Sequence, residues 1–84
     1  MTHQFHPRGV CSRKITFDLE DGIVRNVRFE GGCNGNTQGL ARLAEGMPAR
    51  ELVQRLAGIR CGLKDTSCPD QLAQAVTQAM RENA

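Results

Sequence analysis

Residues 10–20 alternate between apolar and polar side chains, and this alternation constrains the fold more than any other feature of the sequence. The apolar positions that fall on one face of an extended chain are Ile15, Phe17 and Leu19. Such alternation is typical of a strand with one buried and one solvated face. Asp21-Gly22 follows directly and is a strong hairpin signal. We therefore expect an antiparallel hairpin whose second strand covers residues 23–30.

The register of this hairpin depends on the length of its loop. A two-residue turn would place Ile15 opposite Arg28 and would mix apolar with polar residues on one face. A three-residue loop at 20–22 pairs Ile15 with Val27 and keeps that face apolar, so we predict the longer loop. Arg25 is then the misfit, which a β-bulge nearby would accommodate.

The later apolar residues recur at helical spacing, which predicts three helices, over residues 37–45, 49–57 and 69–82. In the first helix the residues expected to face the core are Leu40, Ala41, Leu43 and Ala44. Gly46 and Pro48 separate the first two helices, and Gly58 ends the second. Residues 31–36 contain three glycines and two asparagines, so we expect a loop there, with an asparagine capping the next helix.

A chain of 84 residues makes one domain. We predict an α+β fold: a small antiparallel sheet of two or three strands, followed by three helices packed on one face. Residues 1–9 contain Pro7 and are at most an edge strand, because proline cannot donate to a central ladder. A domain of this size buries only about two-thirds of its unfolded surface. A bound metal or a homodimer would therefore add needed stability.

Charge and composition argue against several classes of protein. The net charge of +2 is small, the basic residues are dispersed, and three phenylalanines offer no stacking platform for nucleic acid. No apolar run approaches the roughly 20 residues needed to cross a bilayer, and the first residues do not resemble a signal peptide. We expect a cytoplasmic protein, in which thiols stay reduced and cysteines favour metal or redox chemistry over disulfides.

The four cysteines are Cys11, Cys33, Cys61 and Cys68. Their spacing contains no Cys-x-x-Cys pair and matches neither zinc ribbons nor ferredoxins. Their positions are more informative: one precedes the first strand's core, one follows the hairpin, and two bracket the start of the last helix. An antiparallel hairpin returns the chain to its origin, so the first two should lie at one end of the sheet. Four converging thiolates suit tetrahedral Zn²⁺ or an iron–sulfur cluster.

Cys68 has the most informative surroundings of the four. Ser67 and Asp70 match the signature of a helix start, which places Cys68 near the positive end of a helix dipole. A thiol at such a position is readily available as a thiolate ligand or nucleophile.

Other interpretations of the candidate ligands stay open on the residues alone. Cys61 and Cys68 could instead form a redox-active pair, or the four thiols could be unrelated. His3 and His6 are further candidate ligands, although histidines near a terminus are usually solvated.

Thr66-Ser67-Cys68-Pro69-Asp70 is similar to the signature of the TSCPD domain family. Residues 10–12, 31–36 and 59–62 match the rest of that family's pattern, and the resemblance covers roughly residues 5–80. The family includes small stand-alone proteins and a C-terminal domain of some adenosylcobalamin-dependent ribonucleotide reductases. The resemblance implies a single TSCPD-type domain over residues 1–84. It also implies that metal is bound by all four cysteines: Cys11, Cys33, Cys61 and Cys68.

The order of elements also resembles that of iron–sulfur cluster assembly scaffolds. Cys11, Cys33 and Cys68 match the three cysteine positions of the scaffold, and the resemblance implies a similar sheet backed by helices. Two departures are visible: Ser12-Arg13 replaces the Gly-Asp that follows the scaffold's first cysteine, and Cys61 is additional. A fourth thiolate without the labilising carboxylate indicates a tighter site than a scaffold's.

We therefore predict a small metal-binding accessory or interaction domain with a four-cysteine site. The family resemblance implies a ribonucleotide reductase or another larger protein as its partner. The chain is too short to build the barrel that ribonucleotide reduction needs, so it is not expected to be an enzyme by itself. The alternatives are an iron–sulfur cluster carrier or scaffold, and a dithiol redox partner of a reductase.

Overall fold

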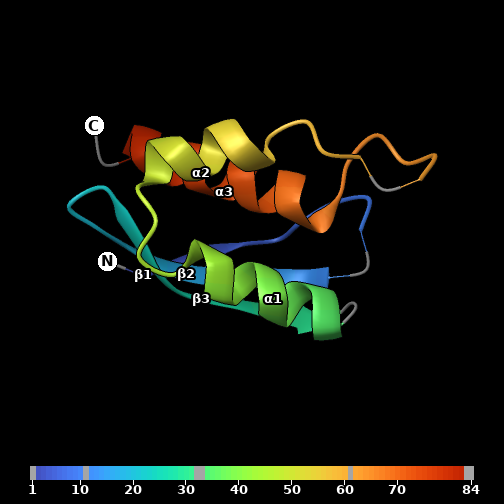
Figure 1. Ribbon diagram of the computed structural model, residues 1–84, viewed down its shortest axis with the longest axis horizontal. Helices are drawn as coiled ribbons and strands as arrows, with labels where there is room; N and C mark the ends of the chain where they lie inside the picture. The colour runs from blue at the N-terminus through green and yellow to red at the C-terminus, as the bar shows by residue number, and fades with distance from the viewer. Residues whose placement is uncertain (1, 11, 32–33, 61, 83–84) are drawn as a thin grey trace.

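The computed structural model describes residues 2–10, 12–31, 34–60 and 62–82. Within these residues a three-stranded antiparallel sheet is followed by three helices, which confirms the predicted α+β fold (Figure 1). The elements are β1 (Thr2–Phe5), β2 (Ser12–Glu20), β3 (Ile23–Gly31), α1 (Asn34–Ala44), α2 (Ala49–Leu56) and α3 (Cys68–Glu82). The strand order is β1-β2-β3, so β1 is an edge strand, as Pro7 led us to expect.

The hairpin turn contains two residues, so the predicted three-residue loop is wrong. Asp21 and Gly22 have φ values of +52° and +77°, the left-handed pair that a tight hairpin turn requires. Glu20 pairs with Ile23 across this turn. The aspartate tolerates the left-handed region better than most residues, which makes the shorter turn accessible.

A β-bulge in β3 makes the shorter turn compatible with an apolar face. Between two consecutive pairs of register partners, β3 contains one residue more than β2. Asn26 lies at this point with φ +56°, and the bulge shifts the side-chain alternation by one. Val24 and Val27 can therefore both be buried. Arg25 faces outward opposite Asp18, so the bulge predicted near Arg25 is confirmed.

Hydrogen bonds hold the bulge in place. The backbone N–H of Asn26 donates to Glu45 at 2.8 Å, and its side-chain amide donates to Asp18, also at 2.8 Å. Arg25 lies 3.8 Å from the Glu45 carboxylate. The hydroxyl of Thr2 and the amide of Asn26, both donating to Asp18, hold the pKa of that carboxyl below its usual value.

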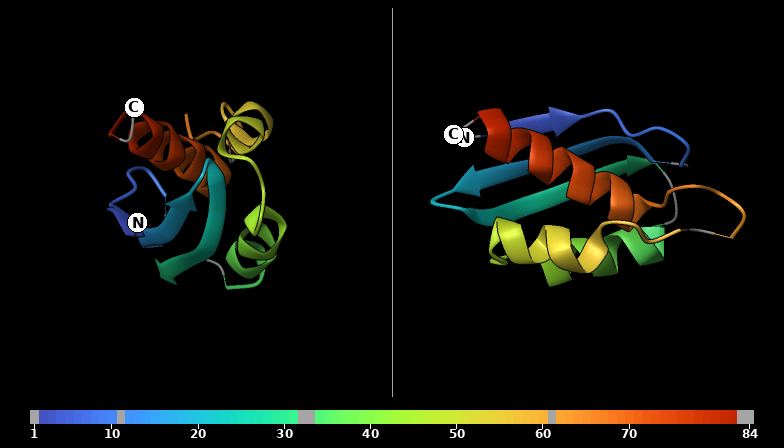
Figure 2. Two further views of the ribbon diagram at one scale, coloured as in Figure 1. Left: turned by 90° about the vertical axis from the view of Figure 1, so that its left-hand side faces the viewer. Right: turned by 90° about the horizontal axis from the view of Figure 1, so that it is seen from above.

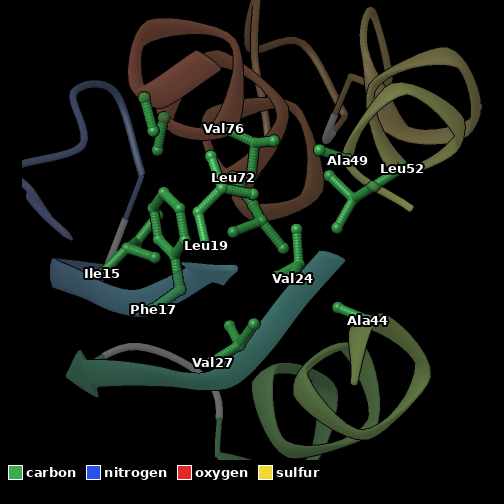
Figure 3. Packing of buried hydrophobic residues seen from close by; sticks show 12 residues of the cluster. Ile15, Phe17, Leu19, Val24, Val27, Ala44, Ala49, Leu52, Leu72 and Val76 are labelled. Carbon is green, nitrogen blue, oxygen red and sulfur yellow. The ribbon is translucent and has the colours of Figure 1, made fainter. Parts of the chain in front are cut away.

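The core lies between one face of the sheet and the helices (Figure 3). α3 crosses this face, α2 packs beside α3, and α1 runs along β3 (Figure 2). The largest fully buried side chains come from β2, β3, α2 and α3: Ile15, Phe17, Val24, Leu52, Leu72 and Val76. The opposite face of the sheet is polar and carries opposite charges across the strands, with Lys14 as the register partner of Glu30.

α1 differs from the prediction at both its start and its face. It begins at Asn34 instead of residue 37, so half of the expected glycine–asparagine loop is helical. The first-turn N–H groups of a helix need no intrahelical partner, which makes Gly35 and Asn36 tolerable there. Leu43, expected inside, is 74% exposed because it lies about 100° around the helix from the buried Ala44.

The connection between α1 and α2 is hydrogen-bonded to the start of β3. Gly46 donates to the Val24 carbonyl at 2.8 Å, and Val24 donates to the Met47 carbonyl at 2.9 Å. Ala49 donates to the Gly22 carbonyl at 2.7 Å. These bonds cover part of the outer edge of β3, which would otherwise be open to another strand.

Asn26→Val is expected to lower the free energy of unfolding by about 1–3 kcal/mol, because a β-branched residue is strained at positive φ. Asn26→Gly should cost much less, since glycine adopts this conformation freely. Urea denaturation measures both. Arg28→Val, on the same strand at ordinary φ, is the control and should change stability by under about 0.5 kcal/mol. Equal effects of Asn26→Val and Arg28→Val would contradict the bulge.

Candidate functional site

One end of the molecule gathers segments that are far apart in the sequence. The start of β2, the end of β3, the start of α1 and the start of α3 lie there in both Figure 1 and the right-hand view of Figure 2. The connection between α2 and α3 extends outward from the same end. This is the end to which the sequence assigned the four-cysteine site.

Ser67 caps the start of α3 and ties it to the end of α2. Its hydroxyl accepts the Asp70 N–H at 3.1 Å, the N-cap bond that the sequence predicted. The same hydroxyl donates to the Ile59 carbonyl at 2.6 Å. The cap therefore also fixes the base of the α2–α3 connection.

The side chain of Asp70 is buried, with 8% exposed, and it forms more hydrogen bonds than the other described side chains at this end. Its carboxylate accepts the Gly58 N–H at 2.7 Å and also bonds of Thr66 and Gln74 side chains. Donation by the Thr66 hydroxyl, then by the Gly58 N–H, holds the pKa of Asp70 below its usual value despite burial. A buried, ionised carboxylate thus joins α3 to the end of α2.

Gln71 extends the network to the chain between β1 and β2. Its side-chain amide donates to the Thr66 hydroxyl at 2.9 Å, and its carbonyl oxygen accepts the Arg8 N–H at 3.1 Å. Gly9 follows with φ +74°, and a side chain there would contact Thr66 at 3.1 Å. Residues 8–9 therefore pack closely against the start of α3.

The thiol of Cys68 lies 3.2 Å from the hydroxyl of Ser12, at the start of β2. Cys68 is partly buried and Ser12 is buried. A second bulge explains the inward position of Ser12, because β2 contains one extra residue between Ser12 and Lys14 relative to β3. Without that extra residue, strict alternation from the buried Ile15 would turn Ser12 outward.

The other three predicted ligands, Cys11, Cys33 and Cys61, lie outside the described residues. Among the residues that the structure does describe, no three His, Cys, Asp or Glu side chains are close enough together to hold a metal ion. Of the four cysteines, Cys68 is thus the one whose surroundings can be given.

His3, a further candidate ligand, lies far from the cysteine end. It is the register partner of Phe17, five residues along β2 from Ser12, which corresponds to about 17 Å. Its ring stacks on Phe17 with 5.4 Å between ring centroids. Its Nδ1 lies 3.9 Å from Glu82, but its buried Nε2 has no hydrogen-bond partner among the described residues. His6 is exposed.

Sequence reasoning found Ser67 and Asp70 as a helix start but missed the role of Thr66, Gln71 and Ser12. Gln71 accepts the N–H of Arg8, which is remote in sequence, and Thr66 bonds to Asp70 and Gln71 across a helix start whose side-chain geometry the residue pattern does not specify. The break in alternation before Ile15 was a signal for Ser12, since an alternating strand would place an arginine, Arg13, on the buried face.

Comparison with known proteins gives one match. A model of the TSCPD domain family matches residues 1–80 of the chain. No curated protein and no solved structure matches it. None of the helices in the described ranges is long and apolar enough to cross a bilayer.

His3→Phe is expected to raise the free energy of unfolding by about 1 kcal/mol, because it keeps the stacked ring and removes a buried nitrogen without a partner. Thermal denaturation measures the effect, and His6→Phe at an exposed position is the matched control. A lower melting temperature for His3→Phe than for the control would contradict this expectation and show that the ring nitrogens of His3 stabilise the fold, for example through Glu82.

Asp70→Asn is expected to lower the free energy of unfolding at pH 7 by about 1–3 kcal/mol, because the charged acceptor of three hydrogen bonds is lost. Since the pKa of Asp70 is lowered on folding, its stabilisation is complete above the ordinary value of 3.8. That stabilisation is lost as the pH falls through the lower folded-state pKa. The difference from the unsubstituted chain should therefore shrink in acid.

Urea denaturation between pH 7 and pH 3 checks this pH dependence. Asp65→Asn, at an exposed position in the preceding connection, is the control and should change stability by under about 0.5 kcal/mol throughout. A deficit for Asp70→Asn that stays constant down to pH 3 would show that the charge of Asp70 does not stabilise the fold.

Proposed function

The chain belongs to the TSCPD domain family, and we propose that it is a small metal-binding accessory domain. Four thiolates would hold one Zn²⁺ ion or one iron–sulfur cluster: those of Cys11, Cys33, Cys61 and Cys68. The bound group would stabilise the fold at one end, and the domain would serve a larger protein. By family resemblance, a ribonucleotide reductase is the first candidate for that protein.

The observation that carries this proposal is the convergence of chain neighbours of the other cysteines on Cys68. Ser12, which follows Cys11, lies 3.2 Å from the Cys68 sulfur. Gly31, two residues before Cys33, is the register partner of Ser12. The carbonyl of Ile59, two residues before Cys61, accepts a hydrogen bond from Ser67, which directly precedes Cys68. Consecutive Cα atoms are 3.8 Å apart. A cysteine only one or two residues from one of these positions therefore cannot lie far from Cys68.

The chemistry of the donor set fits a soft metal. Four sulfur donors suit tetrahedral Zn²⁺, with Zn–S distances of about 2.3 Å, or the irons of a cluster. The Ser12 hydroxyl would then donate a hydrogen bond to the Cys68 thiolate. Such a bond to a ligand orients it and moderates its charge.

A metal at this end would stabilise a part of the chain that lies outside the apolar core. Residues 62–65 of the α2–α3 connection are exposed, and the hydrogen bonds to Ile59 and Gly58 lie at its base. Ligands before β2, after β3, on the connection and on α3 would join the sheet, the connection and α3 through one ion. Small domains commonly use a metal in this way, because their cores supply little stability.

Cys68→Ser is expected to lose bound metal and to melt about 10 °C lower or more, since each kcal/mol shifts the melting temperature of so small a domain by about 4–8 °C. Elemental analysis on protein purified without oxygen or affinity-column metal measures the content, and calorimetry measures the melting. Ser12→Ala is the matched control: it removes the bond to the same sulfur but should keep the metal. Unchanged metal and melting temperature in Cys68→Ser would refute the four-ligand site.

The same elemental analysis of the unsubstituted chain distinguishes the two bound groups. Near one zinc per chain supports a structural site, and a chelator should then unfold the protein. Iron with matching acid-labile sulfide supports a cluster. The absence of both would contradict the proposal and leave a redox-active thiol pair or four unrelated thiols.

A further inference from the structure

Large apolar side chains are exposed on α1 and on the α2–α3 connection, and two of them, Leu43 and Ile59, line the same hollow. Within the described ranges three such residues are exposed: Leu43 at 74%, Ile59 at 41% and Leu63 at 105%. Leu43 lies on α1, while Ile59 and Leu63 belong to the α2–α3 connection. Exposed apolar side chains that gather on one surface are a mark of an interaction site.

A groove runs between α1 and the α2–α3 side of the molecule. One hollow, of about 550 Å³, is lined by Leu40, Leu43, Ile59, Cys68 and Pro69 among others. A second, of about 250 Å³, shares Leu40 and Leu43 and continues to Met47 and Leu56. We call the two together the α1–α2 groove. It exists because α1 packs against β3 while α2 packs against α3.

The rim of the α1–α2 groove is basic. Arg60 lines the larger hollow and Arg55 lines the smaller one, and no Asp or Glu of the described ranges lines either hollow. Arg60 forms no ion pair with any other described residue, whereas Arg55 pairs with Glu51 at 2.9 Å. Glu45 pairs with Arg25, while Asp65 is an exposed acid of the α2–α3 connection that lines neither hollow.

We propose that the α1–α2 groove binds an amphipathic helix of the larger partner protein, with leucine-like residues on one face and Asp or Glu beside them. This inference rests on the proposed accessory function and names the kind of segment that the domain recognises. Apolar residues of such a helix at positions i, i+4 and i+7 fill a groove of this type. Its carboxylates would meet Arg60 at the rim.

A second copy of the chain fits the groove less well than an acidic helix. α2 carries Arg50 in addition to the paired Glu51 and Arg55, and α1 carries Arg42 with no acid in its first turn. Docking either helix into the groove of another copy would bring cations to a basic rim. The observed charges therefore favour a partner of opposite sign.

A display library of helical peptides, selected on the purified full chain, tests this proposal. We expect the selected sequences to share apolar residues at i, i+4 and i+7 and an excess of Asp and Glu. Leu43→Asp should weaken the best peptide at least tenfold, since an anchor contact is typically worth more than about 1 kcal/mol. Arg60→Glu should weaken it by about as much, and more so at low salt.

Arg28→Glu is the matched control, because it makes the same charge change at an exposed position on β3, away from the groove. It should change the affinity less than about twofold. Leu43 and Arg60 are both exposed, so their variants should keep the circular dichroism spectrum and melting temperature of the unsubstituted chain.

Several outcomes would overturn the proposal. They are a selection without enrichment, a preference for basic or uncharged peptides, and affinity that survives both groove substitutions. Self-association in sedimentation that Leu43→Asp abolishes would identify a second copy as the occupant instead. Zinc and iron contents of the same preparations keep the two proposals apart. Metal without peptide binding would refute the groove alone, and peptide binding without metal would refute the four-cysteine site alone.

Discussion

The buried carboxylate of Asp70 is the interaction on which the cysteine end of the molecule depends. It binds the Gly58 N–H and the Thr66 hydroxyl, and so joins the end of α2 to the start of α3. α3 supplies Leu72 and Val76 to the core, so a shift of its first turn would also displace the core residues that follow. The buried charge is tolerable because the carboxylate accepts hydrogen bonds from the Thr66 hydroxyl and the Gly58 N–H, and these bonds hold the pKa of Asp70 below its usual value.

Most of residues 66–70 form a frame of hydrogen bonds that holds the start of α3, whereas Cys68 presents its thiol. Thr66, Ser67 and Asp70 bond to one another or to the end of α2, and Gln71 extends the frame to residues 8–9. Pro69 occupies the first turn of α3, where the missing N–H costs nothing. Cys68 is the member whose side chain reaches the sheet, at Ser12. Replacing a residue of this frame would therefore disrupt the site as readily as replacing Cys68.

Pattern reasoning predicted the fold well where one rule decided the outcome, and failed where two rules competed. Alternation located β2, and helical spacing located α2 and α3 to within a residue. The register of the hairpin was mispredicted because an uninterrupted ladder was assumed. The left-handed conformation of Asn26 allows a short turn and an apolar face to coexist. An asparagine in a strand does not by itself predict a bulge, however. The bond between Gln71 and Arg8 joins residues remote in sequence, which no local pattern encodes.

The proposed site and the α1–α2 groove share one segment of chain. Ile59 and Leu63 stand on either side of Cys61 in the sequence, and Cys68 and Pro69 line the groove themselves. A metal that bound Cys61 and Cys68 would therefore restrain one wall of the groove, while α1 forms the other wall independently. A groove with a restrained wall loses less conformational entropy when a helix docks, so metal binding would favour partner binding without touching the partner. The four cysteines would then serve recognition through the shape that they hold.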